Sequence, residues 1–384
     1  MRHHALTVGL LLLGAGCGKS DDDTAAAPVD TPEPYVPDYD DSNCRGDFVW
    51  TSWEERSDNG TVDFTLELPE GRSFQMTVEA RQDDIVTMAS QVTHPSGAVA
   101  YTWNDWNNTS QNYTYAAYPE TAVSTLNYPV RASDAPYEAG TWLIEFFTLD
   151  RTGDYIDGVP VSIWLYVAED DSLETGCVYV DVSYADGVSA DEAVTDAVEA
   201  AFARWNQIWL GYGLKVIPLN IRSVAIDADA PSPQAGDAVY DKLSRSDEPI
   251  LQLVVAESIS GEAALGEAGS IPGSLASTPH AAVTLSWLQH AGADGVLDAQ
   301  DVQTMGETMA HEASHFLGLF HPVEFSDGVA TSYDALGDTP ACDSRDDCDD
   351  SLEENLMYPY ATGSVQDVLT EEQVGVLQRW TGVQ

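Results

Sequence analysis

The residues best suited to chemistry lie between positions 311 and 322, where the chain reads His-Glu-Ala-Ser-His-Phe-Leu-Gly-Leu-Phe-His-Pro. His311 and His315 are four residues apart, so on a helix both imidazoles project from one face, at a separation that one tetrahedral Zn²⁺ can bridge. Gly318 can end this helix with a positive φ and return His321 as a third ligand. Three protein ligands leave one position for water, which is typical of a catalytic zinc site and not of a structural one.

Glu312 follows the first of these histidines, where a carboxylate can reach a water without ligating the metal. Bound Zn²⁺ would lower the pKa of that water and polarise a carbonyl group, while Glu312 would accept the proton as general base and pass it to a leaving amine. Five fixed residues at these spacings arise by chance in about 10⁻⁵ of sequences with this composition. His94, His280 and His290 lack such spacing, and we expect them to be surface or structural residues.

The same motif, followed by Asn-Leu-Met-Tyr-Pro-Tyr at 355–360, resembles the metzincin metallopeptidases, whose signature is HExxHxxGxxH with a later methionine-containing turn. The turn is most similar to that of the matrixins. The resemblance implies peptide-bond hydrolysis with one catalytic Zn²⁺, and Met357 as a hydrophobic floor beneath the metal. It also implies an edge strand that pairs with extended substrate, for which residues 267–272 are the candidate. The substrate-pocket candidates are Tyr358, Tyr360, Gly269, Ser270 and Ile271.

Residues 176–384 must supply the elements that position this site, and their hydrophobic pattern is of mixed type. Residues 178–182 alternate as a strand, and Ser189-Ala190-Asp191-Glu192 reads as a capping box that opens a helix. A second helix, which carries the zinc motif, is expected from about Asp298. Further strands are expected near 214–224, 250–255 and 282–287. This order predicts an α/β (α+β) metzincin-like catalytic domain with one covered sheet.

Residues 44–175 show the two-residue alternation of strands, separated by turn sequences such as Asp-Asn-Gly at 58–60. We expect an all-β sandwich of about eight strands, jelly-roll-like in layout. It resembles the pre-peptidase C-terminal domains of secreted bacterial peptidases. The tyrosines and tryptophans between 101 and 118 are either a ligand platform or ordinary packing residues. The chain is therefore predicted to be multidomain, with this sandwich before the catalytic domain.

Residues 1–17 have a basic start, an apolar stretch and small residues before Cys17, as in a secretory signal peptide. This arrangement resembles a bacterial lipobox, which implies lipidation of Cys17; plain secretion is the alternative. Residues 18–43 are acidic and rich in proline, and we expect a disordered tether. The predicted location is therefore outside the cytoplasm, either lipid-anchored at a bacterial membrane or cell surface or secreted.

The cysteines fit an exported protein, because four remain after Cys17 is set aside. Proximity and elimination suggest a local Cys342–Cys348 bridge and a second bridge from Cys44 to Cys177, with a free Cys44 as the alternative. The loop around the first pair also carries an aspartate cluster that is either a Ca²⁺ site or a solvated loop. Its members are Asp343, Asp346, Asp347, Asp349 and Asp350.

The charge of the chain excludes several partners. Asp and Glu number 64 against 15 Lys and Arg, which gives a net charge of −49. Neither a phosphate backbone nor an anionic lipid surface binds such a chain, so we expect no nucleic acid and a membrane contact only through the lipid anchor. The acidity suits either solubility or a saline medium. We expect a monomer that acts on peptides or proteins.

The function predicted from these features is a secreted or surface-anchored zinc-dependent endopeptidase, with Glu312 as general base. The alternative is an adhesion or glycan-binding lipoprotein in which the β-sandwich acts and the zinc domain is vestigial.

Overall fold

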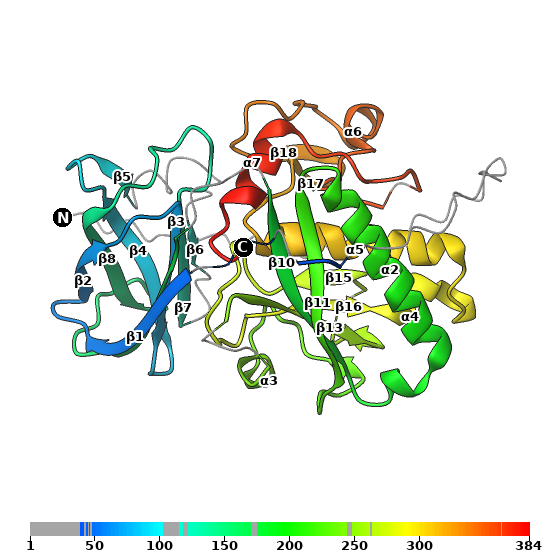
Figure 1. Cartoon of the computed structure of the whole chain (residues 1–384), viewed down its shortest axis with the longest axis horizontal. Helices are drawn as coiled ribbons and strands as arrows, with labels where there is room; N and C mark the ends of the chain where they lie inside the picture. The colour runs from blue at the N-terminus through cyan, green and yellow to red at the C-terminus, as the bar shows by residue number, and fades with distance from the viewer. Residues whose placement is uncertain are drawn as a thin grey trace.

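The protein is a mixed α/β chain with several sheets, which Figure 1 shows as a strand-only part and a part that combines strands with helices. The computed structural model describes residues 39–41, 44, 46, 48–102, 115–117, 122–169, 175–243, 248–261, 263–361 and 363–384. The predicted signal peptide with Cys17, nearly all of the predicted tether and most of the aromatic 101–118 segment lie outside these residues. Within them, no helix is long and apolar enough to span a membrane.

The strands between positions 48 and 168 form two antiparallel sheets, with the orders β1-β9-β3-β7-β6 and β2-β8-β4-β5. Alternate apolar residues of both sheets, such as Phe64, Met76 and Ile163, are buried in one hydrophobic core. The described part of this region thus contains nine strands where about eight were expected. They are β1 (Phe48–Arg56), β2 (Thr61–Leu68), β3 (Ser73–Ala80), β4 (Ile85–Thr93), β5 (Val99–Thr102), β6 (Tyr115–Ala117), β7 (Val123–Tyr128), β8 (Gly140–Asp150) and β9 (Pro160–Ala168).

The remainder of the chain is built on a five-stranded sheet of order β11-β10-β13-β16-β15. The first four strands run parallel, and β15 pairs antiparallel with β16 at the edge. The three strand positions expected after residue 200 are confirmed. The strands are β10 (Gly176–Tyr184), β11 (Leu214–Ser223), β13 (Ile250–Ala256), β15 (Gly266–Ala268) and β16 (Val283–Ser286).

Two long helices, α2 (Glu192–Leu210) and α5 (Ala299–Phe316), pack against each other, α2 next to β11 and α5 next to β15 and β16. The expected start of the second helix is confirmed, because the Asp298 side chain caps α5 together with Asp301. The expected capping box of α2 is wrong. Its N-cap is Asp191, which accepts from the backbone of the first turn, whereas the Ser189 hydroxyl bonds to Ser223.

The smaller elements complete this part of the molecule. They are η1 (Val188–Ala190), β12 (Asp229–Ala230), α3 (Ala238–Asp241), β14 (Ser258–Ile259), α4 (Trp287–Ala291), η2 (Gly292–Asp294), β17 (Val323–Ser326), β18 (Val329–Tyr333), α6 (Arg345–Leu352) and α7 (Glu371–Arg379). Strands β12 and β14 pair in parallel, and β17 and β18 form an antiparallel hairpin.

Both predicted disulfides are present. Cys44 pairs with Cys177 at the start of β10, and Cys342 pairs with Cys348 in α6. The alternative of a free Cys44 is therefore wrong. The first bridge ties the segment before β1 to the sheet that carries β15.

The outer face of β3 and β7 is polar and yet buried, because it contacts the helical part of the molecule. The Gln75 amide donates to Gly273 O (3.0 Å), and its oxygen accepts from Leu275 N (2.7 Å). Asn127 Oδ1 similarly accepts from Thr381 N at 3.1 Å. In Figure 1, helix α7 and the end of the chain lie between the two parts. This contact attaches the two antiparallel sheets to residues 273–275, next to the end of α5.

We predict that Gln75→Leu destabilises the protein by about 2–4 kcal/mol, since it leaves a buried N–H and a buried carbonyl without the amide. Urea unfolding measures this difference. Gln91→Leu is the matched control, because the Gln91 side chain is exposed on β4 and its amide donates to Thr93. Equal stability of the two variants would contradict the role given to Gln75.

Candidate metal centre and active site

Three histidine side chains converge at the carboxyl end of α5. His311 and His315 lie one turn apart on the helix, and His321 follows the turn after it. The Nε2 atom of His321 lies 3.2 Å from that of His311 and 3.0 Å from that of His315. All three rings are buried. The predicted ligand set is therefore brought together in space.

The opposite ring nitrogens fix the direction in which the three imidazoles point. His311 Nδ1 donates to Leu356 O (2.6 Å) and His315 Nδ1 donates to Leu319 O (2.6 Å). Carbonyl oxygens only accept, so both rings carry their proton on Nδ1 and keep a lone pair on Nε2. His321 Nδ1 lies 2.9 Å from the carboxylate of Glu324. This contact directs the Nε2 atom of His321 toward the two other histidines.

The electrostatics of the cluster favour neutral rings. Burial, together with the neighbouring His321, lowers the pKa of His311 to about 3. Burial and the two other rings likewise hold the pKa of His315 well below its ordinary value. Metal ligation requires unprotonated imidazoles, so these shifts prepare the site for a cation at neutral pH.

The donor set fits Zn²⁺. Tetrahedral coordination with Zn–N bonds of 2.0–2.1 Å places pairs of nitrogen ligands ~3.3 Å apart. The His321 Nε2 distances of 3.0 and 3.2 Å to the two other nitrogens approach this value without any rearrangement. Within the described stretches of the chain, these histidines are the one group of three or more ligand side chains close enough to hold a metal ion.

Gly318 gives the chain the turn that returns the third histidine. Helix α5 ends at Phe316, and Gly318 adopts φ = 116°, a region that side-chain-bearing residues rarely enter. The positive φ expected from the sequence is confirmed. Strand β17 then begins at Val323 and carries Glu324 next to His321.

Glu312 is buried beside the histidines and faces the edge of the sheet. The backbone N–H of Ala268 on β15 donates to its carboxylate. Burial and, to a smaller extent, the carboxylate of Glu267 raise the pKa of Glu312 to about 8. A divalent cation on the three imidazoles would oppose this shift and favour the ionised form. The side chain can therefore exchange a proton near neutral pH.

The predicted methionine turn lies directly behind the histidines. Leu356 supplies the carbonyl that His311 bonds, and Met357 is fully buried in the main core. Asn355 shapes the turn, since its Oδ1 accepts from Met357 N (2.9 Å) and its amide donates to Gln373 on α7 (3.0 Å). The methionine turn is thus bonded both to α5 and to α7.

The two tyrosines after the methionine mainly pack around α6. Tyr358 is buried with Val323 and the Cys342–Cys348 bridge, and its hydroxyl donates to Asp349. Tyr360 stacks under the guanidinium of Arg345, 4.1 Å from the ring centre. Tyr358 also borders a small cavity next to His311. A role for either residue in substrate binding stays a prediction.

The predicted edge strand is present but shorter than expected. Strand β15 covers Gly266–Ala268, whereas 267–272 was predicted. Gly269 and Ser270 are buried and Ile271 is half-buried in the segment that follows. This segment leads to Gly273, whose N–H donates to Phe316 O at the end of α5 (2.6 Å). Residues 269–271 therefore connect the edge strand to the carboxyl end of the zinc helix.

The structure gives no support for the calcium site. Asp347 accepts from the backbone of Asp343, and Asp349 accepts from Tyr358, so these carboxylates serve the fold of α6.

The other histidines that the structure describes have structural partners, as expected. The rings of His94, His280 and His290 are buried and bond to the backbone at Pro136, Pro233 and Ser286, respectively.

Two contributors were missed at the sequence level. Ala268 acts through its backbone N–H, which no residue type reveals. Glu324 stands three residues after His321, but this spacing indicates proximity only in a helix, whereas His321 lies just before strand β17 and Glu324 lies in it.

Comparison with known proteins gives only distant similarities. No protein-family profile and no curated protein matches the chain. Metalloproteinase-II from Bacteroides fragilis is similar over 72% of this chain and 68% of its own, with 13% identity and a TM-score of 0.33. An archaemetzincin from Methanopyrus kandleri is similar over 53% and 87%, with 15% identity and a TM-score of 0.26. At these TM-scores the assignment of function depends on the site itself.

We predict that Glu324→Ala weakens zinc binding about 10–100-fold, because residues that orient a ligating histidine typically contribute this much. Competition with a chromogenic chelator measures the dissociation constant. Glu199→Ala, which removes an exposed carboxylate from α2, is the control and should leave the constant unchanged. An equal effect of both substitutions would indicate a general loss of negative charge instead.

Proposed function

We propose that the protein is an exported zinc-dependent endopeptidase of the metzincin type. The observation that carries this proposal is the convergence of three imidazole nitrogens beside a buried carboxylate with a raised pKa. His311, His315 and His321 would hold the metal, and Glu312 would serve as general base. When bound, Zn²⁺ supplies a Lewis acid that polarises a carbonyl group and acidifies a water molecule.

The residues of the chain supply proton transfer and orientation. Glu312 accepts a proton from the attacking water and delivers it to the amine that leaves. The Ala268 N–H holds the carboxylate on the side of the edge strand. Glu324 and the carbonyls of Leu356 and Leu319 hold the three imidazoles in one orientation. Because the three imidazoles and the Glu312 side chain are buried, little water competes for their hydrogen bonds, and the electrostatic attraction within each bond is stronger.

Strand β15 would bind the substrate backbone. Leu265 and Gly269 bond to the neighbouring β16 segment, so by alternation Gly266 and Ala268 turn their backbone groups away from β16, toward the side where the Ala268 N–H meets the Glu312 carboxylate. An extended peptide could pair with β15 as a further strand, and its backbone would then lie next to the Glu312 side chain. This arrangement favours unfolded segments of proteins or flexible peptides as substrates.

The other predictions from the sequence complete the proposal. Lipidation of Cys17 would anchor the enzyme outside the cytoplasm, and residues 18–43 would serve as a tether. Residues 44–175 would form a β-sandwich domain attached to the peptidase domain of residues 176–384. The two disulfides support an oxidising location, where such bridges persist.

We predict that Glu312→Gln lowers peptide hydrolysis about 10²–10⁴-fold while zinc binding is retained, because the amide cannot accept the proton. Cleavage of an unfolded, fluorescently labelled protein measures the activity, and removal of zinc with a chelator should abolish it in the unaltered protein. Glu199→Gln is the control. The mechanism would be wrong if the Glu312 variant kept full activity, and the proposed function would be wrong if chelation had no effect.

A further inference from the structure

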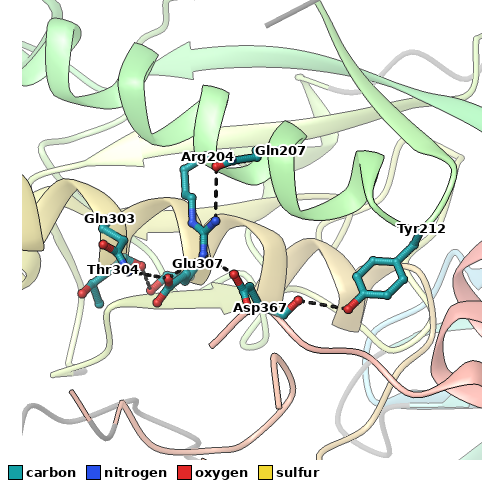
Figure 2. Close-up of polar contacts among 8 residues, drawn as sticks. Arg204, Gln207, Tyr212, Gln303, Thr304, Glu307 and Asp367 are labelled. Carbon is teal, nitrogen blue, oxygen red and sulfur yellow. Dashed lines mark hydrogen bonds and ion pairs between the residues drawn. The ribbon is translucent and has the colours of Figure 1, made fainter. Parts of the chain in front are cut away.

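A network of charged and polar side chains joins α2, α5 and the segment after the methionine turn (Figure 2). Arg204 on α2 donates through Nη2 to Glu307 on α5 (3.1 Å) and to Asp367 (2.6 Å). Its Nη1 donates to Gln207 at 3.2 Å. The Glu307 carboxylate also accepts from Gln303 at 3.0 Å. One guanidinium thus bridges two carboxylates from elements that are far apart in sequence.

The network lies next to the metal centre. Glu307 precedes His311 by about one turn of α5. Asp367 is followed by Val368, which pairs with the methionine turn through its backbone. The Val368 carbonyl accepts from Leu356 N (2.8 Å), and the Val368 N–H donates to Glu354 O (3.0 Å). Leu356 in turn supplies the carbonyl that orients His311. Two short paths therefore lead from Arg204 to the same imidazole, one through the helix and one through the turn.

The two helices approach closely at this point. A Cβ atom at Gly306 would lie 2.6 Å from both Ala201 O and Arg204 Cβ, so only glycine permits the observed separation. This contact holds the base of the Arg204 side chain directly against α5. The guanidinium can then reach Glu307 and Asp367 together.

A second set of hydrogen bonds holds residues 367–369. The Tyr212 hydroxyl, just after α2, donates to Asp367 O (3.1 Å) and accepts from Leu369 N (2.8 Å). Figure 2 shows Tyr212 and Arg204 reaching Asp367 from opposite sides. Residues 367–369 are therefore held to α2 at both the side chain and the backbone.

Packing does not fill all of the space between the methionine turn and α5. A cavity of about 20 Å³, bordered by Glu307, His311, Leu356 and Gln366, lies between them. A space of this size holds about one water molecule and leaves the surrounding side chains fewer contacts. The position of the Leu356 carbonyl relative to His311 thus depends on hydrogen bonds and on the segment that Arg204 holds.

We infer that Arg204 is a positioning residue for the zinc centre, which acts by locking the methionine turn to α5 through Asp367 and Glu307. This inference rests on the proposed function. It predicts that the arginine sets metal affinity, although it does not contact any of the three histidines.

The test measures zinc dissociation constants by chelator competition, together with melting temperatures of the zinc-free proteins. We expect Arg204→Met and Asp367→Ala each to weaken zinc binding about tenfold, the lower end of the range for groups that orient ligands indirectly. Arg204→Lys keeps a donor and should restore most of the affinity. Gln207→Ala, which removes a partner of Arg204 outside the two paths, should change the constant less than about twofold.

The two substitutions should also be non-additive, because both remove the same Arg204–Asp367 contact. The double variant Arg204→Met/Asp367→Ala should therefore bind zinc about as weakly as either single variant. Unchanged zinc affinity in Asp367→Ala would overturn the inference, whether or not Arg204→Met folds. A lowered melting temperature with unchanged affinity would do the same and leave Arg204 as a structural residue. Failure of the unaltered protein to bind zinc would instead overturn the proposed function.

Discussion

The arrangement of the site depends on three hydrogen bonds that the histidines donate away from their cluster. Each Nδ1 has an oxygen partner: the carbonyls of Leu356 and Leu319, and the carboxylate of Glu324. These partners come from the methionine turn, the turn after α5 and the β17–β18 hairpin. Three separate segments must therefore reach their places before the Nε2 atoms can converge, and much of the surrounding fold serves to bring them there.

The net charge of −49 contrasts with the chemistry at the centre of the site. Among the described residues, most acidic side chains are exposed or half-buried, where water and salt screen them. Glu312 and Glu307 are buried, and burial raises the pKa of both carboxyl groups. Arg204 offsets this cost for Glu307, whereas Glu312 accepts from the backbone N–H of Ala268 and has a pKa of about 8, which suits proton exchange. Local environment, and not overall acidity, separates the structural carboxylate from the reactive one.

The sequence predicted the candidate metal ligands better than the contacts that orient them. The spacing of His311, His315 and His321 reflects helix geometry and one turn, so three ligands could be identified without tertiary information. The strands and both long helices followed from hydrophobic period in the same way. The first turn of α2 was misassigned by two residues, because Ser189 and Asp191 are both acceptable caps and only the chain path decides between them.

Apart from the Cys44–Cys177 bridge, contacts between distant segments could not be predicted. Arg204 and Asp367 are 163 residues apart and carry no spacing signal. The outer face of β3 shows the alternation of a solvent-exposed face, yet Gln75 is buried because another part of the chain covers it. The edge strand was placed too late by one residue and extended too far, since the backbone leaves the sheet after Ala268. Such features depend on which surfaces meet, and local patterns do not encode that.

The contact between Gln75 and residues 273–275 also affects how the molecule fluctuates. Gly273 accepts from Gln75 on one side and donates to Phe316 on the other, beside the second histidine. A local opening that separated β3 from this segment would remove the support of the last turn of α5. The slow exchange of amide hydrogens at the metal centre would then be governed by an interface on the far side of the helix end. The antiparallel sheets thereby share a cooperative unit with the site.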